Sequence, residues 1–189
     1  SLLRLQARRL PMGGGRVALQ EAERRIRSIG FVHEILSLDA GDQVAFNEIV
    51  RQLVRMAEDA VVNLDRPVRF AVSGDSGELA ADVATPLAVV LTELLQNAAE
   101  HAFPEEPSAT LALDPGEVVV TLANDGPVLH VEVRDNGRGL PEGFSIDAGD
   151  SLGLSIVRDL VMTQLGGTIT MRTDGGTVVD LEIPTTRPG

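Results

Sequence analysis

Apolar residues recur at two spacings along this chain, and each spacing predicts a different kind of element. Apolar residues at every third or fourth position predict helices over residues 16–37, 46–61, 85–102 and 151–165. Alternation predicts strands over residues 68–74, 117–125, 128–137, 168–173 and 177–184. These elements do not follow a repeating strand–helix–strand order, so we expect an α+β domain rather than a doubly wound parallel sheet.

Turn and capping residues predict where the elements begin and end. Thr85 followed by Pro86 is typical of a helix start, because Thr caps a helix and Pro fits its first position. Gly166 and Gly167 are expected to end the helix that begins near Ser151. Residues 125–127 (DGP) and 174–176 (DGG) are turn sequences, so the strands on either side of each should form hairpins.

The first sixty residues carry a separate helical pattern. The pattern predicts helical segments over residues 1–10 and 16–37, separated by the break PMGGG, and a linker over residues 38–42. Such a hairpin cannot bury its own apolar stripe, so it must pack on the rest of the chain or on a second copy, and we favour a homodimer. We expect two domains, 1–62 and 63–187, and because the chain opens on Ser1 within a helical pattern we expect a longer protein.

Composition narrows the classes of function. The chain has 189 residues, a net charge of -12, and neither lysine nor cysteine. An acidic surface repels phosphate backbones, so no nucleic acid partner is expected. Without lysine the chain can build neither a P-loop, nor a eukaryotic-type protein kinase site, nor a Schiff base. No apolar run reaches the roughly 18 residues of a membrane span, and the lack of cysteine fits a cytoplasmic location.

The predicted helix over residues 85–102 has a polar side opposite its leucines. Glu93, Asn97 and His101 are spaced four apart and therefore share that side. Carboxylate and amide oxygens suit Mg²⁺, which makes Asn97, with Glu93 as a second candidate, a magnesium-binding hypothesis. An ordinary solvated helix edge gives the same spacing, and taken alone that plainer interpretation is favoured.

A glycine-rich segment follows the strand over residues 128–137. In RDNGRGLPEG, Asp135 comes at the end of the strand, where a buried aspartate accepts a hydrogen bond from an exocyclic amine. Gly137 and Gly139 allow the backbone to approach a ligand closely, although Asn-Gly is also common in plain hairpin turns. The spacing does not match a dinucleotide-binding loop, and Pro141 interrupts a helix start, so that interpretation is rejected.

A second glycine pair opens the helix over residues 151–165. Gly149 and Gly153 bracket a turn in GDSLGLSIVRDL, and the free N–H groups of the following helix start suit an anion. The alternative is an ordinary helix start capped by Asp150 or Ser151.

The order of these motifs is more specific than any one of them. E-x-x-x-N-A, D-x-G-x-G and G-x-x-x-G-L, followed by Gly176-Thr177, resemble the GHKL ATP-binding domain of histidine kinases, gyrase-type ATPases, Hsp90-type chaperones and MutL-type proteins. The resemblance covers roughly Asp65 to Pro184. It implies ATP and Mg²⁺ as cofactors. It also implies the Bergerat fold, a two-layer α/β sandwich with a mixed, mainly antiparallel sheet and about three helices, here preceded by a partial helical hairpin.

The same resemblance implies roles for individual positions. Asn97 would hold Mg²⁺, Glu93 would orient or deprotonate the attacking group, and Asp135 would read adenine. The further nucleotide-binding positions are His101, Gly137, Arg138, Gly139, Gly149, Ser151, Leu152, Gly153, Leu154 and Thr177. Residues 140–150, with Phe144, resemble a short mobile lid.

The helical region indicates a branch of that family. LLRLQARRL and RRIRSIGFVHEILS resemble the dimerisation region of second-type (HWE-like) histidine kinases, close to cytosolic actinobacterial sensor kinases. This implies transfer of the γ-phosphoryl of ATP to a histidine and then to an aspartate in the receiver domain of a response regulator. In that family the acceptor histidine precedes the segment matching LLRLQARRL, so we expect this chain to bind ATP without phosphorylating itself. His33 and His130 are expected to be structural.

One departure from the family pattern concerns charge. Many members have Lys at the position of Glu100, and an acid there does not neutralise phosphate. Arg138 or Arg158, with Mg²⁺ and backbone amides, would have to supply that stabilisation. Three alternatives remain: an anti-sigma-factor-type serine kinase on the same fold, a non-catalytic nucleotide-binding or dimerisation module, and plain ATP hydrolysis.

Overall fold

The computed structural model describes residues 30, 43–61, 67–103, 115–146 and 152–185. The chain divides into two compact units, Ser1–Ala40 and Gly41–Gly189, and the elements below all belong to the second. The predicted helical hairpin over residues 1–37 lies outside the described residues, except for Gly30. Within the described ranges no helix is both long and apolar enough to cross a bilayer.

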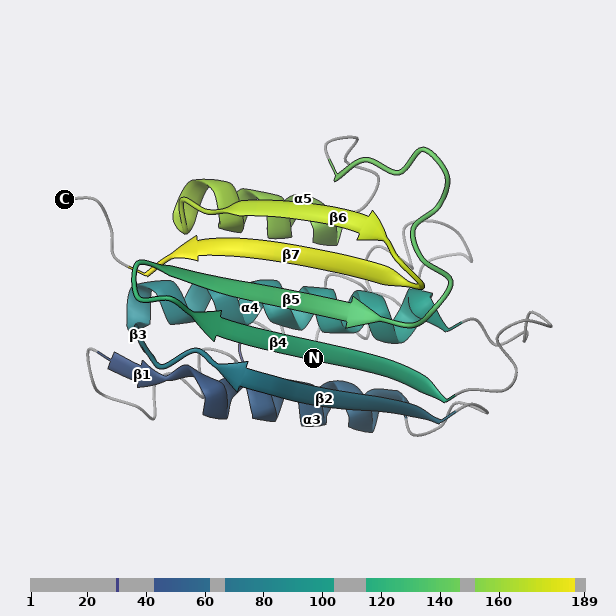
Figure 1. Cartoon of the computed structure of the whole chain (residues 1–189), viewed down its shortest axis with the longest axis horizontal. Coiled ribbons are helices and arrows are strands. Elements are labelled where there is room, and N and C mark those ends of the chain that lie inside the picture. The colour runs from purple at the N-terminus through teal and green to yellow at the C-terminus, as the bar shows by residue number, and fades with distance from the viewer. Residues whose placement is uncertain (1–29, 31–42, 62–66, 104–114, 147–151, 186–189) are drawn as a thin grey trace, which may run out of the picture. The chain divides into compact units, whose positions relative to one another are not determined.

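A five-stranded sheet forms one layer of this second unit (Figure 1). Its strands are β2 (Val68–Asp75), β4 (Gly116–Asn124), β5 (Val128–Asp135), β6 (Thr168–Thr173) and β7 (Thr177–Pro184). They are ordered β2-β4-β5-β7-β6, with β2 parallel to β4 and every other neighbouring pair antiparallel. The prediction of a mixed, mainly antiparallel sheet is therefore confirmed, with strand ends shifted by no more than two residues.

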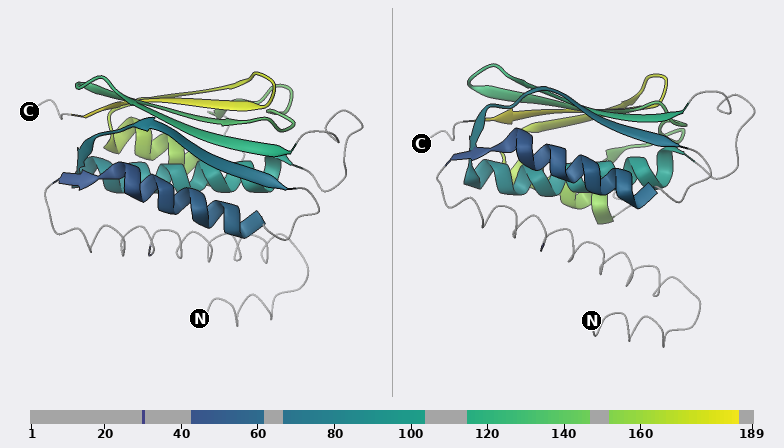
Figure 2. Two further views of the ribbon diagram at one scale, coloured as in Figure 1. Left: turned by 60° about the horizontal axis from the view of Figure 1, so that its bottom comes forward. Right: turned by 90° about the horizontal axis from the view of Figure 1, so that it is seen from below.

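Three described helices form the second layer and cover one face of the sheet (Figure 2). They are α3 (Phe46–Val61), α4 (Ala81–Asn97) and α5 (Leu152–Asp159). A π-helical turn extends α4 as η1 (Ala98–Ala102), and another extends α5 as η3 (Leu160–Gln164). This arrangement confirms the predicted two-layer α/β sandwich.

The strand periodicity decides which side chains face the helices. In β5, Leu129, Val131 and Val133 are buried, and the residues between them are only half-buried. Side chains alternate across a strand, so the same inward series ends on Asp135. The side chain of Asp135, the last residue of β5, therefore faces the interior, and it is buried.

The predicted start of α4 at Thr85-Pro86 is wrong. The helix begins at Ala81, and Pro86 lies inside it, where the Thr85 hydroxyl donates a hydrogen bond to the Ala81 carbonyl at 2.7 Å. Val83 and Ala84 are buried in this added turn. Burial of that turn outweighs the single backbone hydrogen bond that proline removes near a helix start.

Two short strands were not predicted. β1 (Gln43–Ala45) pairs antiparallel with β3 (Glu78–Ala80). β1 directly precedes α3, and β3 directly precedes α4.

The expected domain boundary near residue 62 differs from the compact division after Ala40. The reason is α3, which packs against both β2 and α4 and so belongs to the same unit as the sheet.

Candidate functional site

A cavity of about 340 Å³ lies between α4 with η1, the strands β5, β6 and β7, and the segment after β5. The helical wall is formed by Leu94, Asn97, Ala98, His101, Ala102 and Leu154. The sheet provides Val133, Asp135, Met171, Thr177 and Val179, and the segment after β5 provides Arg138, Gly139, Leu140, Pro141, Phe144, Ser145 and Ile146. A mainly apolar wall with a few polar groups is typical of a small-molecule site.

Asp135 is the most precisely held polar group of this cavity. Its side chain is 6% exposed, and Oδ1 accepts backbone hydrogen bonds from Gly137 at 2.9 Å and from Thr177 at 3.0 Å. Among the described residues no hydrogen bond reaches Oδ2. Two fixed donors on one oxygen thus orient the carboxyl group and leave the other oxygen for a donor from a ligand.

The loop after Asp135 is fastened to the end of the α4–η1 helix. The Arg138 N–H donates to the Ala102 carbonyl at 3.0 Å. A Cβ on Gly137 would lie 2.4 Å from that same oxygen, so only glycine allows this contact. The sequence explained Gly137 by close approach to a ligand, whereas the structure shows close approach to the helix.

The β6–β7 hairpin closes on Asp135 from the other side. A Cβ on Gly176 would lie 2.0 Å from the Asp135 carbonyl oxygen, and Gly176 has a φ of +152°. The next residue, Thr177, donates its N–H to Asp135. Glycine before Thr177 therefore lets the hairpin approach close enough for that hydrogen bond.

The polar side of α4 divides into two environments. Asn97 and His101 lie in the cavity wall, whereas Glu93 does not. Glu93 is 6% exposed and has a polar interaction of its own. Nδ2 of Asn97 is buried and has no hydrogen-bond partner among the described residues. A buried amide donor without a partner costs free energy, so Asn97 is the polar group of this wall whose environment is incomplete.

The other predicted site residues are placed as follows. Arg138, Gly139, Leu154 and Thr177 lie in the cavity wall, and Gly137 is the buried neighbour of Arg138. Gly153 is buried in the first turn of α5, which begins at Leu152. Gly149 and Ser151 lie outside the described residues, as does the part of the predicted lid from 147 to 150. The lid residues 140, 141 and 144–146 line the cavity.

Sequence reasoning missed most of the apolar lining. The missed residues are Leu94, Ala98, Ala102, Val133, Met171 and Val179. A signal was present in the strands: Val133 and Val179 lie two positions from Asp135 and Thr177, on the same inward faces. Met171 is paired with Val179 across β6 and β7. Among the described residues no group of three or more His, Asp or Glu side chains is arranged to hold a metal ion.

Comparison with known proteins gives two family matches. Residues 82–187 match the family described as histidine kinase-, DNA gyrase B-, and HSP90-like ATPase. Residues 1–61 match a second family, described as histidine kinase. The boundary between the matches lies near the domain boundary expected from the sequence, although α3 packs with the second unit.

Individual relatives point the same way. The chain is 44% identical, over its whole length, to sensor histidine kinase PdtaS of Mycobacterium tuberculosis, and it spans 37% of that protein. Among solved structures, the histidine kinase domain of the blue-light activated kinase EL346 of Erythrobacter litoralis has a TM-score of 0.72 at 22% identity, covering 97% of this chain and 93% of that one. Histidine kinase ThkA in complex with response regulator protein TrrA has a TM-score of 0.59 at 22% identity, covering 98% and 55%.

The first family match covers more than half of the chain and contains Asp135, both glycine segments and all of α4 except Ala81. The fold, the motif order and this match agree. The chain therefore belongs to the histidine kinase-, DNA gyrase B- and HSP90-like ATPase family.

Proposed function

We propose that the cavity binds Mg²⁺–ATP and that the chain is the catalytic portion of a two-component sensor histidine kinase. The observation that carries the proposal is a pair of unmet polar groups in one cavity. Oδ2 of Asp135 and Nδ2 of Asn97 have no hydrogen-bond partner among the described residues. A nucleotide offers a donor to the first on its base and acceptors to the second on its phosphates.

Asp135 would recognise the base. A carboxylate oxygen accepts hydrogen bonds, so Oδ2 favours a ring edge that carries an amino group over one that carries a carbonyl oxygen. The apolar side chains Val133, Met171 and Val179 line the same cavity and would pack against the flat ring. Because Oδ1 is held by two backbone amides, this acceptor is oriented before the ligand arrives.

Asn97 would act at the phosphate end. Its Nδ2 would donate to a phosphate oxygen or to a water on the metal, and its Oδ1 is an oxygen ligand of the kind that Mg²⁺ takes. Mg²⁺ in such sites relies on one or two protein ligands together with substrate phosphates, which fits the described part of the wall, where no larger ligand cluster is found. When bound, the ion would offset part of the phosphate charge.

Glu93 and the start of α5 would complete the chemistry. Glu93 lies one turn before Asn97 on α4 and would orient the attacking imidazole. The first turn of α5, from Leu152 through Gly153 and Leu154, would supply backbone N–H groups without partners inside the helix, and such groups bind phosphates. Gly149 and Ser151, which precede it in the chain, remain predicted phosphate contacts.

The kinase assignment rests on the relatives. The chain spans about 37% of the curated sensor kinases that it matches at 44% identity, so the proposal names neither the acceptor histidine nor the sensed signal. We propose transfer of the γ-phosphoryl to histidine, then to a response regulator such as the one bound to ThkA. The histidine kinase match over residues 1–61 favours this over a serine kinase. A homodimer through the helical region is part of the same proposal.

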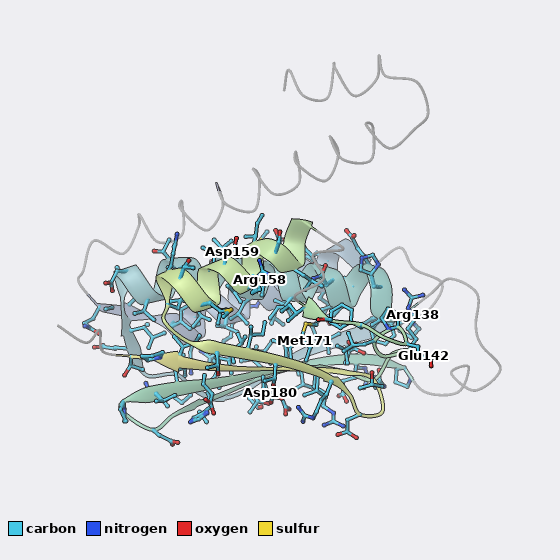
Figure 3. All side chains as sticks on the ribbon, turned by 90° about the horizontal axis from the view of Figure 1, so that it is seen from above. Arg138, Glu142, Arg158, Asp159, Met171 and Asp180 are labelled. Carbon is cyan, nitrogen blue, oxygen red and sulfur yellow. The ribbon has the colours of Figure 1, made fainter. Side chains whose placement is uncertain are left out.

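Calorimetry with ATP and Mg²⁺ tests the site. Asp135→Asn and Asn97→Ala should each weaken binding by about tenfold or more, since each removes a hydrogen bond to a charged or buried group. The matched controls are Asp180→Asn, on the sheet face away from the helices (Figure 3), and Gln52→Ala, exposed on α3. Wild-type protein that binds no nucleotide, or site variants that bind as well as the controls, would contradict the proposal.

A further inference from the structure

The charge balance of the cavity differs from that of the whole chain. The chain carries a net charge of -12 and has no lysine, so a bound polyphosphate must find its protein cations among 16 arginines and three histidines. Among the described residues that line the cavity, Arg138 is the one arginine, and His101 is the one histidine. Arg138 is therefore the permanently charged cation of this wall.

The backbone of Arg138 is held in place on both sides. Its N–H is bound to the Ala102 carbonyl, and Gly137 is packed against Ala102. On the other side Gly139 has a φ of +74°, and a Cβ there would lie 2.6 Å from Cγ2 of Thr173. The position of residue 138 is thus fixed by contacts that do not use its side chain.

The guanidinium of Arg138 has no ion pair or hydrogen bond with any described residue, and the side chain is exposed. Figure 3 shows it at the end of the domain, extending away from the loop that carries it. A rigid backbone with an unpaired, solvated guanidinium at the cavity rim is suited to an anionic ligand. Guanidinium presents several N–H donors in a fork that matches phosphate oxygens.

Arg158, the other arginine that the sequence offered, has a different environment. It does not line the cavity, and its Nη2 lies 3.3 Å from Oδ1 of Asp159. In Figure 3 it lies on α5 beside Asp159, well apart from Arg138. Arg134, on β5, is likewise bound to Asp174. Both of these arginines already have carboxylate partners, and Arg138 has none among the described residues.

We propose that Arg138 contacts the phosphates of the bound nucleotide and supplies the positive charge that Glu100, an acid, cannot supply. This inference rests on the proposed function of the cavity. Asp135 is buried and would take the base, whereas Arg138 is exposed, so a phosphate chain that leaves the cavity toward solvent would pass this guanidinium. Glu142, exposed in the following segment, adds negative charge near the rim and increases the need for a cation there.

Calorimetry with a ligand series separates phosphate binding from base binding. ATP, ADP, AMP and adenosine would be titrated into the whole chain with Mg²⁺, as wild type, Arg138→Gln and Arg138→Lys. Arg69→Gln is the matched control, because Arg69 is exposed on β2, has no ion pair with the described residues and changes net charge equally.

The inference predicts a graded loss. Arg138→Gln should weaken ATP binding by about tenfold or more, AMP less, and adenosine by less than about twofold, since a charge-assisted hydrogen bond is lost only with phosphates. Arg138→Lys should lie between wild type and Arg138→Gln. Wild-type affinity for ATP should also fall more steeply with salt than that of Arg138→Gln.

Three results would overturn the inference. Equal weakening of adenosine and ATP would assign Arg138 to the base, and behaviour like Arg69→Gln would show that it contacts nothing. In both cases wild-type binding of ATP would leave the proposed function standing. Wild-type protein that binds neither ATP nor adenosine would overturn the proposed function and this inference together.

Discussion

Two D-x-G turns end two strands of the sheet, and they serve different purposes. Asp75 ends β2 and Asp135 ends β5, and in each turn Oδ1 accepts the N–H of the glycine two residues on, at 2.9 Å. β2 and β5 run in opposite directions, so these turns lie at opposite ends of the sheet. Their local hydrogen bonding is the same.

The surroundings of the two turns differ. Asn47 donates to Asp75 at 2.8 Å, and its Oδ1 accepts both the N–H and the hydroxyl of Ser76. That carboxyl group is exposed, and its neighbours are satisfied. Asp135 is buried and lines the same cavity as Asn97, whose Nδ2 has no described partner. The Asp75 turn has satisfied groups and stabilises the fold, whereas the cavity that the Asp135 turn helps to line contains a buried donor without a described partner and so leaves room for a ligand.

The largest contrast is expected between alanine substitutions of the two turn glycines. Gly137→Ala would place Cβ 2.4 Å from the Ala102 carbonyl oxygen, whereas Gly77→Ala meets its nearest atom at 3.4 Å and strains only a φ of +65°. We expect about 3 kcal/mol or more of lost unfolding free energy for the first and about 1 kcal/mol for the second. Urea unfolding measures both, and equal losses would show that the helix contact does not hold the loop.

The aspartates should separate binding from stability. Asp135→Asn keeps the shape of the side chain but turns an acceptor into a donor on one side, so ATP affinity should fall by about 10- to 100-fold. Asp75→Asn should leave ATP affinity unchanged and lower stability by about 1 kcal/mol at most. Calorimetry and urea unfolding on both variants decide this. If Asp75→Asn also weakened ATP binding, the two turns would not be independent.

Among the two asparagines near these turns, Asn47 should matter for stability and Asn97 for nucleotide binding. Asn47→Ala removes the acceptor for both groups of Ser76, which is fully buried, and should cost about 1–3 kcal/mol without changing nucleotide affinity. Asn97→Ala removes a buried donor that has no described partner, so stability should stay within about 1 kcal/mol. ATP affinity should nevertheless fall. A large loss of stability in Asn97→Ala would mean that this amide is satisfied within the fold.

The smallest effect is expected where the cavity segment begins. The Leu140 N–H donates to Oγ1 of Thr173 at 3.1 Å, and Thr173→Val removes only that acceptor. We expect a loss of about 0.5–1 kcal/mol in the free energy of unfolding and a smaller fall in ATP affinity than for Asp135→Asn. Thr170→Val, exposed on the same strand, is the control. Identical unfolding curves for the two variants would show that this hydrogen bond does not contribute.

Local patterns predicted the elements well and their packing poorly. The apolar stripe of α3 and the alternation of β6 and β7 gave the observed ranges, because period and turn residues act within a few positions. The start of α4 was wrong because burial of Val83 and Ala84, which depends on the rest of the core, outweighed a capping signal. The three-residue strands β1 and β3 are too short to leave a periodic signal.

The sequence by itself determined the order of the longer helices and strands from residue 46 onward, the inward position of Asp135 and, through motif order, the kind of ligand to expect. Only the tertiary structure decided which D-x-G turn is satisfied, because the partner of Asp75 is Asn47, 28 residues earlier in the chain. It likewise separated Arg138 from Arg158, since Arg138 lines the cavity and Arg158 does not, and cavity lining depends on packing that spacing does not reveal. Periodicity is a local property, whereas an unmet hydrogen bond is defined by every group that packs around it.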